Sequence, residues 1–276
     1  MKCHAAEVNQ WKTTPHAQTF ETVHRPPEAK EIASRLGLRS VKRNETCTQC
    51  HYTLAEQRGK HRAVAGVSCE SCHGAAKDWV ELHSDYGGPD VTRVTESAAH
   101  RQQRIDASIA EGMNNPANLY LVARQCLACH TTPHEELVNV GGHVPGSVDF
   151  ELVAWSQGMV RHNFLRGDGV NVPASRERLR VMYVVGVLAD LEASFRAVAK
   201  ATEKATYGVT AAKRALAQKK RLYEIAQIVD NSHIQQALEA ALATPLKLGN
   251  RDGLQKAAQA VGEAAYQCAA TADGAE

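Results

Sequence analysis

The chain lacks any long hydrophobic run and carries no excess of either charge. Its longest apolar stretch, Val181 to Ala189, has nine residues, whereas a bilayer-spanning helix needs about 20. The 32 basic residues are nearly balanced by 30 acidic ones, which argues against nucleic-acid binding through a basic surface. With 9 prolines and 19 glycines in 276 residues, a low-complexity disordered chain is also excluded. The composition therefore indicates a folded protein of one or two domains with no transmembrane segment.

Phenylalanine and methionine are scarce, while histidine and cysteine are abundant. The chain has 4 Phe and 4 Met against 13 His and 8 Cys. Twelve of the histidines and seven of the cysteines precede residue 163. A segment with so few large apolar side chains and so many potential ligands is expected to build its core around a bound group.

Three copies of the pentapeptide Cys-x-x-Cys-His carry the chemistry. They comprise Cys47, Cys50 and His51; Cys69, Cys72 and His73; and Cys126, Cys129 and His130. This pentapeptide is the attachment signature of c-type haem. Two thiols add across the vinyl groups, and the histidine that follows reaches the iron from one face. A turn of helix keeps the three groups on one side, which explains the tight spacing.

Zinc and disulfides are the alternative interpretations of these cysteines. Zinc sites also use Cys-x-x-Cys pairs, but they do not require a histidine directly after every second cysteine. A four-cysteine zinc site also uses two such pairs, so three pairs would leave one pair unused. Disulfides would leave the three histidines unexplained, so haem is the prediction.

The N-terminus matches the end of a fourth motif. Cys3 and His4 would complete Cys-Met-Lys-Cys-His if a cysteine preceded Met1. We therefore expect the sequence to begin inside a haem motif, with the first cysteine and a secretory signal upstream. A chance Cys-His dipeptide is the alternative. As written, Cys3 can form only one thioether, so four haems c are predicted, three of them on complete motifs.

Several segments occur in the order found in a known family. Cys3-His4 is followed by Trp11-Lys12-Thr13-Thr14-Pro15-His16, by the Cys47 motif, and by Gly66-Val67-Ser68-Cys69-Glu70-Ser71-Cys72-His73-Gly74. Over roughly residues 1–165 the chain resembles the tetrahaem cytochrome c-554 family. The resemblance implies periplasmic electron transfer. The missing first cysteine departs from the family pattern, and the C-terminal region lies outside it.

Histidine is the expected ligand on the other face of each iron. Only Met113, Met159 and Met182 lie inside the chain, against eight spare histidines before residue 163. Bis-histidine ligation is therefore predicted, and it favours lower potentials than His/Met ligation. The four predicted distal ligands are His16, His83, His143 and His162.

Sequence context supports three of these four assignments, and His162 is assigned from the segment Arg161-His162-Asn163-Phe164. His16 follows Pro15, which can start a helix, and it ends the family's Trp-x-x-Thr-x-His segment. His83 lies on the segment that leaves the Cys69 motif and is expected to serve a neighbouring haem. His143 follows Gly141-Gly142, where a backbone without Cβ could approach a porphyrin. For each of the four, the alternative is a solvated or packing histidine. The rival ligands are His134, His24, His61 and His100, of which His134 is the main rival because its Thr-Thr-Pro-His string repeats that of His16.

The chain is predicted to be all-α, with a loop-rich multihaem cytochrome domain followed by a helical bundle. Residues 1–172 contain many turn signals, with short helices expected near 15–23, 29–36, 75–83 and 94–111 and no convincing strand. From Ala174 onward, 25 of 103 residues are alanine. Four helices are expected there, at about 174–204, 208–229, 232–243 and 251–270. The predicted domains are 1–172, with short helices around stacked haems, and 173–276.

Two classes of function follow from the sequence. The first is electron transfer between periplasmic redox proteins through mainly bis-histidine haems. The alternative is an oxidoreductase that acts on a small nitrogen or sulfur compound at one five-coordinate haem, with Arg161, His100 and Tyr120 as candidate proton donors. A haem module in a larger complex, joined through the C-terminal helices, is a third interpretation. The predicted location is periplasmic or exported, since thioether attachment is completed outside the cytoplasm.

A basic patch and a lone cysteine are the remaining features. A basic patch that could dock an acidic redox partner is formed by Lys213, Arg214, Lys219, Lys220 and Arg221, with a solvated helix face as the alternative. Cys268 is expected to be a small buried residue.

Overall fold

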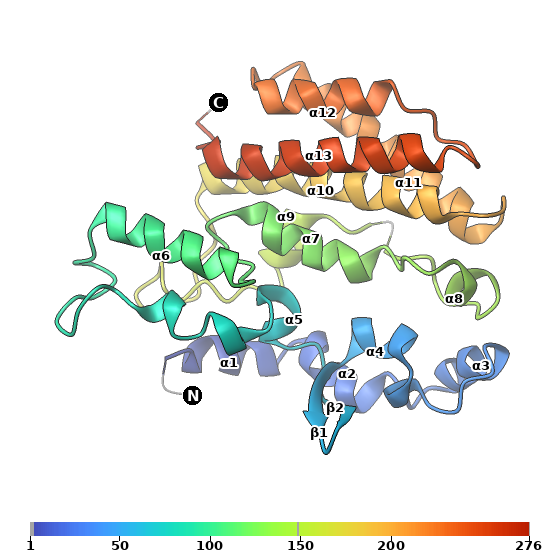
Figure 1. The fold of residues 1–276 in the computed structure, drawn as a ribbon, viewed down its shortest axis with the longest axis horizontal. Helices are drawn as coiled ribbons and strands as arrows, with labels where there is room; N and C mark the ends of the chain where they lie inside the picture. Colours follow the sequence, from blue (N-terminus) through green and yellow to red (C-terminus); the bar gives the residue numbers. More distant parts are fainter. Residues whose placement is uncertain (1–2, 148, 276) are drawn as a thin grey trace.

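The N-terminal half of the chain is a series of short helices and turns. The structure is a computed structural model that describes residues 3–147 and 149–275 (Figure 1). The first elements in chain order are α1 (Ala5–Lys12), α2 (Pro15–Thr22), α3 (Pro27–Arg35), η1 (Val41–Arg43), α4 (Glu45–His51), β1 (Thr53–Gln57), β2 (Lys60–Ala65), α5 (Cys69–His73), η2 (Ala76–Asp78) and η3 (Leu82–Ser84). Pro15 and Pro27 occupy the first turns of α2 and α3, where proline fits because its missing N–H has no helical partner.

Longer helices follow and dominate the second half. They are α6 (Ala98–Ala110), α7 (Leu119–His130), α8 (Glu135–Asn139), α9 (Leu152–Ser156), α10 (Arg176–Lys200), α11 (Thr206–Ala226), α12 (Ser232–Leu242) and α13 (Arg251–Thr271). Ser175 caps α10 by accepting a hydrogen bond from the N–H of Arg178, and Asn231 caps α12 in the same way. The predicted mostly helical fold is confirmed, and the four C-terminal helices begin and end close to the predicted residues.

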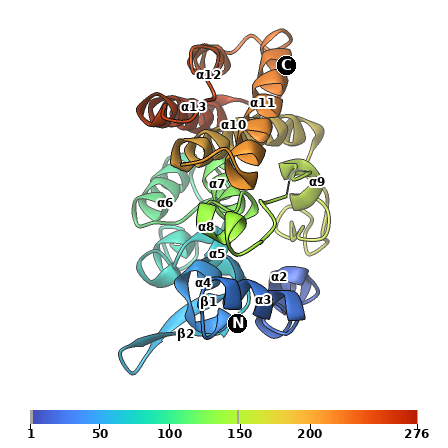
Figure 2. The same ribbon diagram turned by 90° about the vertical axis from the view of Figure 1, so that its right-hand side faces the viewer.

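The β1–β2 hairpin was not predicted. The strands pair antiparallel, and the turn residues Arg58 and Gly59 both have positive φ, of 55° and 71°. That combination matches the tight turn that suits the twist of a hairpin. The hairpin extends from the body (Figure 2). Its side chains are exposed or half-buried and none is fully buried, so its sequence shows no clear alternation of large apolar residues.

The helix expected over residues 75–83 is also wrong. The segment forms the two short turns η2 and η3 instead. A nine-residue segment gains too little from its own hydrogen bonds to stay helical, so packing decides. Here the turns place the Trp79 ring edge-on against the His83 ring, 5.3 Å between centroids.

Buried apolar side chains are distributed unevenly. Helix α10 packs against α7, α9, α11 and α13, and its Val185, Leu188, Leu191 and Phe195 are fully buried. Among the described residues before Leu119, the buried hydrophobic residues are only Val8, Ala33, Cys47, Tyr52 and Trp79. A segment of that length cannot be held together by so little apolar burial.

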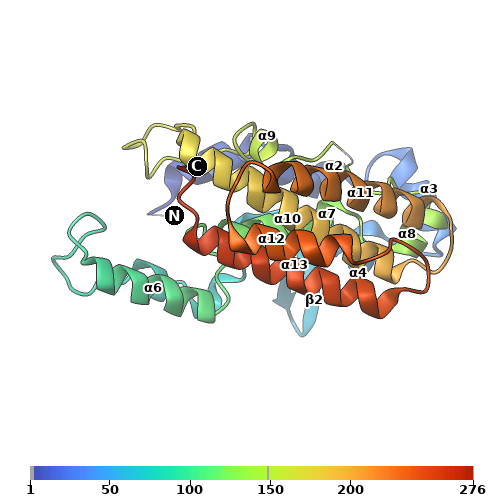
Figure 3. The same ribbon diagram turned by 90° about the horizontal axis from the view of Figure 1, so that it is seen from above.

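The elements form layers (Figures 1 and 2). Helices α10 to α13 lie on one side, α1 to α5 lie on the other, and α7 lies between them. In the view from above, α6 projects sideways, away from the other helices (Figure 3). Within the described ranges, none of the helices is both long enough and apolar enough to cross a bilayer.

Candidate haem centres

The three complete motifs all lie at the C-terminal ends of helices. Helices α4, α5 and α7 each end at the motif histidine, so both cysteines and the histidine fall within the last turns. The side chains of Asn44 and Asn118 cap the N-termini of α4 and α7, and a capping box formed by Ser68 and Ser71 fixes α5. Local sequence therefore sets the helical turn that the motif requires.

Each motif histidine lies opposite a second histidine from a distant part of the chain. The distances between ring centroids are 6.1 Å for His4 and His83, 6.1 Å for His16 and His130, 6.2 Å for His51 and His143, and 6.1 Å for His73 and His162. These four pairs bring together His4, the three histidines of the complete motifs and the four predicted distal histidines.

The near-constant separation has a chemical meaning. A metal bonded to one nitrogen of each ring adds about 2 Å on either side, and a five-membered ring with bonds of about 1.3 Å has a radius of about 1 Å. Two imidazoles on opposite sides of one metal ion are therefore expected about 6 Å apart, centroid to centroid. Two imidazoles leave the equatorial positions of an octahedral metal open, and a porphyrin supplies four nitrogens in that plane.

The surroundings of the pairs fit a large apolar group with polar edges. Phe150 and Trp155 lie 5.0 Å and 5.1 Å from the His130 ring. Large hydrophobic side chains next to the distal histidines in the chain are exposed, including Val80, Leu82, Val144 and Met159.

Several buried polar atoms near the pairs also lack a partner. Among the described residues, Trp79 Nε1, Arg161 Nε and Tyr52 Oη are buried without one. Buried donors are rarely left unpaired in a complete structure, so they fit a site that a group with carboxylate edges occupies.

The motif histidines are held in the neutral form that binds metals. Burial lowers the pKa of His51 and His73, with smaller contributions from the facing His143 and His162. Burial and the neighbouring His16, Arg214 and His51 lower the pKa of His130 to about 4. A neutral imidazole nitrogen is the form that donates its electron pair to a metal.

The motif thiols lie close to one another. Cys50 and Cys129 are within hydrogen-bonding reach, so the second cysteines of two motifs meet. Burial raises the pKa of Cys72 to about 11 and that of Cys126 to about 12, each with a further contribution from neighbouring thiols of its own and another motif. Three motifs therefore converge on one region of the structure.

Comparison with known proteins agrees with this geometry. Residues 1–74 match the family model described as "Cytochrome c554 and c-prime". The chain is 27% identical over 137 residues to cytochrome c-554 of Nitrosomonas europaea, an alignment that covers 46% of this chain and 53% of that protein. The N-terminal part of this chain is therefore similar to the cytochrome c-554 family. That similarity supports haem c as the cofactor.

The family match covers only part of the molecule. The chain spans about half the length of the curated cytochrome c-554 that it matches. No solved structure matches the chain. The Cys126 motif and the distal candidates His83, His143 and His162 lie beyond the residues matched by the cytochrome c-554 model.

The four rival histidines have other surroundings. His134 contacts the Gln49 side chain, His61 is exposed on β2, and His100 contacts Glu96. The Nδ1 atom of His24 is buried without a partner.

Gly141 and Gly142 also allow close contacts within the protein. A Cβ atom on Gly142 would meet the Arg35 guanidinium, and Arg35 donates a hydrogen bond to the Gly141 carbonyl. Their missing Cβ atoms therefore make room for Arg35 and for the α8 backbone.

Sequence reasoning missed the role of Arg214. Arg214 and Asp190 are 7% and 3% exposed and form two hydrogen bonds, of 2.5 and 3.0 Å. Nη1 of Arg214 also donates to the carbonyls of His130, at 3.3 Å, and Ser147, at 2.7 Å. Arg214 therefore connects α11 to the backbone of a motif histidine, and it does not belong to an exposed basic patch.

Proposed function

We propose that this chain is a tetrahaem c-type cytochrome that transfers electrons between redox proteins outside the cytoplasm through bis-histidine haems. The observation that carries this proposal is the set of four imidazole pairs at 6.1 to 6.2 Å. In each pair, His4 or a motif histidine is the proximal ligand. The distal ligands are His83 for His4, His143 for His51, His162 for His73, and His16 for His130.

The cysteines would provide covalent attachment. Three haems would each be held through two thioethers, formed by Cys47 and Cys50, by Cys69 and Cys72, and by Cys126 and Cys129. Cys3 would contribute to the fourth. Bound haem supplies one-electron chemistry as its iron alternates between the ferric and ferrous states. The protein residues fix the spacing, and burial keeps the imidazoles of His51, His73 and His130 neutral.

The contacts between pairs support a single row of sites. The His51 and His130 pairs are neighbours because His51 contributes to the pKa of His130 and Cys50 reaches Cys129. The His73 and His4 pairs are neighbours because His4 contributes to the pKa of His73. Helix α5 packs against α7, which joins the two halves. The order is then His4, His73, His130 and His51.

Electron transfer is favoured over the oxidoreductase alternative. Each motif histidine faces a second imidazole, which supports six-coordinate iron. Of the proposed proton donors, Tyr120 donates to Glu192 across 2.6 Å, and this contact lies between α7 and α10. The redox partners are other proteins, and the C-terminal helices are a candidate surface for a partner or a second copy.

Absorption spectra of the exported holoprotein with a haem count test this proposal. We expect four haems per chain, low-spin in both oxidation states, that do not bind carbon monoxide. Replacing His162 with Ala should produce one high-spin haem that binds carbon monoxide, whereas His61→Ala on the exposed hairpin should leave the spectra unchanged. Fewer than four haems, or a carbon monoxide-binding haem in the wild type, would contradict the tetrahaem bis-histidine assignment.

A further inference from the structure

The segment that carries His83 has little apolar packing of its own. His83 lies in η3, and the nearby Val80, Leu82 and Val94 are 42%, 36% and 83% exposed. Turns at Gly87, with φ of 94°, and at Gly88 lead from η3 toward α6. Apart from the contact between His83 and Trp79, polar contacts must therefore hold this segment in place.

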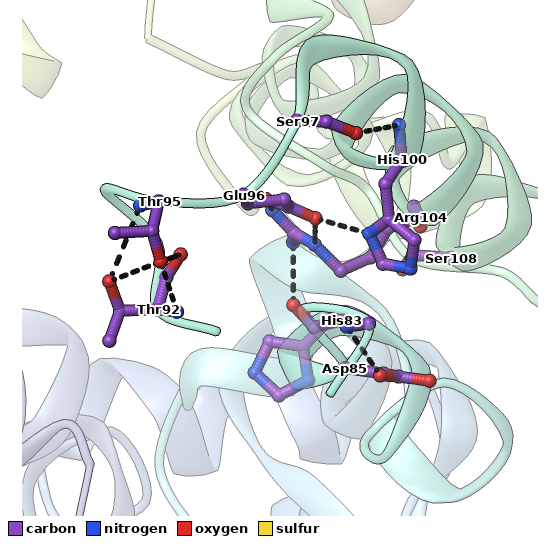
Figure 4. Close-up of polar contacts among 10 residues, drawn as sticks. His83, Asp85, Thr92, Thr95, Glu96, Ser97, His100, Arg104 and Ser108 are labelled. Carbon is purple, nitrogen blue, oxygen red and sulfur yellow. Dashed lines mark hydrogen bonds and ion pairs between the residues drawn. The ribbon is translucent and has the colours of Figure 1, made fainter. Parts of the chain in front are cut away.

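Arg104 of α6 supplies the principal contact. Its Nη1 atom donates a hydrogen bond of 2.7 Å to the backbone carbonyl of His83 (Figure 4). The Arg104 side chain is only 11% exposed, and the Tyr86 ring lies against its guanidinium, 4.8 Å from the ring centroid. Arg104 therefore reaches from α6 to the residue that faces His4.

Glu96 fixes the direction of Arg104. The two carboxylate oxygens accept hydrogen bonds of 2.8 Å from Nε and 2.7 Å from Nη2, so the guanidinium is held as a fork. The Glu96 side chain has no exposed area, and Oε1 also lies 2.8 Å from Nδ1 of His100. With Nε and Nη2 occupied by Glu96, Nη1 is directed at the His83 carbonyl (Figure 4).

The charge state of this cluster is stable. Hydrogen bonds from Arg104 are the main reason that the pKa of Glu96 falls to about 2. The carboxylate therefore remains ionised at any pH near neutrality, and the contact with Arg104 persists.

We propose, on the basis of the ligand pairs of the proposed function, that Glu96 and Arg104 form a clamp that positions His83 opposite His4 and so determines the coordination state of that haem. Both are positioning residues, because they act through the backbone of His83 and touch neither the iron nor the imidazole. Loss of the clamp frees the His83 segment and leaves one axial position of this haem open to an external ligand.

Three variants of the exported holoprotein test the clamp. Arg104→Met removes the donors and keeps much of the side-chain length, whereas Glu96→Gln keeps the shape of the carboxyl group and weakens the fork. Arg104→Lys keeps the charge, but its single ammonium cannot hold Glu96 in a fork while it reaches the His83 carbonyl. Arg101→Met is the matched control, because Arg101 is an exposed arginine of the same helix.

The expected result is a change at one haem. Arg104→Met should convert one haem per chain to a high-spin form that binds carbon monoxide, and added imidazole should restore the low-spin spectrum. Arg104→Lys and Glu96→Gln should show the same change to a smaller extent. Arg101→Met should match the wild type.

A reference variant separates this inference from the proposed function. His83→Ala should give the full high-spin signal of one haem; if its spectrum is unchanged, His83 is not a ligand and the pairing itself fails. If His83→Ala gives the signal while Arg104→Met, folded by circular dichroism and with four haems, remains fully low-spin, the clamp is refuted. If Arg104→Met does not fold, the spin state and carbon monoxide binding of Glu96→Gln decide the question instead.

Discussion

At the scale of single residues, the buried ion pair of Asp190 and Arg214 is the feature whose disruption should destabilise the protein most. Asp190 accepts hydrogen bonds from Arg214, Gln218 and Ser194 and lies almost entirely out of solvent. A buried ion pair stabilises little relative to a hydrophobic pair, but removing one partner strands the other charge. We therefore expect the pair to contribute little net stability and to act mainly by fixing how α10 and α11 pack together.

Removing Arg214 alone should be costly. We expect Arg214→Met to lower the free energy of unfolding by about 3–5 kcal/mol, because it leaves Asp190 buried and unpaired. Chemical denaturation followed by circular dichroism measures this. The neighbouring exposed Lys213 is the control, and Lys213→Met should change stability by less than about 0.5 kcal/mol. The double variant Arg214→Met with Asp190→Asn should recover part of the loss; equal losses in Arg214→Met and Lys213→Met would contradict the argument.

At the scale of elements, the sequence predicts helices well and contacts between distant segments poorly. Alanine content and breaks such as Thr244-Pro245 and Gly249-Asn250 help to locate α10 to α13, because each helix carries its own signals. The solvated hairpin carries no such pattern. The motif residues are readable from spacing alone, but the partner of each motif histidine is set by tertiary structure, as His4 and His83 illustrate. Arg104 and Glu96 had no sequence signal at all.

The end of α5 offers a test at this scale. Gly74 terminates the Cys69 motif helix with φ of 86°, and a Cβ atom there would collide with the Gly112 carbonyl oxygen. Gly59, with φ of 71°, has open space around it. Gly59→Ala should cost about 1–2 kcal/mol of backbone strain, and Gly74→Ala should cost more and reduce haem incorporation. Thermal unfolding and haem content of both variants provide the comparison, and equal effects would show that the contact with Gly112 is unimportant.

At the scale of the whole molecule, the two halves are stabilised by different means. The C-terminal helices have a continuous apolar core that includes Leu188, Phe195, Leu254 and Val261. The described residues before Leu119 bury few hydrophobic side chains and instead contribute at least one histidine to each of the four pairs. Haem binding and folding should therefore be coupled strongly in the first half and weakly in the second.

Hydrogen exchange of the haem-free chain should reveal this division. We expect the amides of α10, α11 and α13 to stay protected, because their core needs no cofactor, and those of α1 to α5 to exchange nearly freely. In the holoprotein both regions should be protected. Uniform protection, or uniform loss of protection, in the haem-free chain would contradict a cofactor-dependent first half.

The central place of α7 has a consequence for biogenesis. Ala123 and Leu127 of this helix are 0% and 1% exposed and lie under α10 and α13, and the same helix ends in Cys126, Cys129 and His130. An attachment enzyme needs access to those thiols while the chain is still open. Because a chain emerges N-terminus first, residues 126–130 precede the helices that later cover them. If a haem is held at Cys126 and Cys129 as proposed, the bundle of α10 to α13 would close over a haem that is already attached, and the timing of its folding would set the interval in which maturation can be completed.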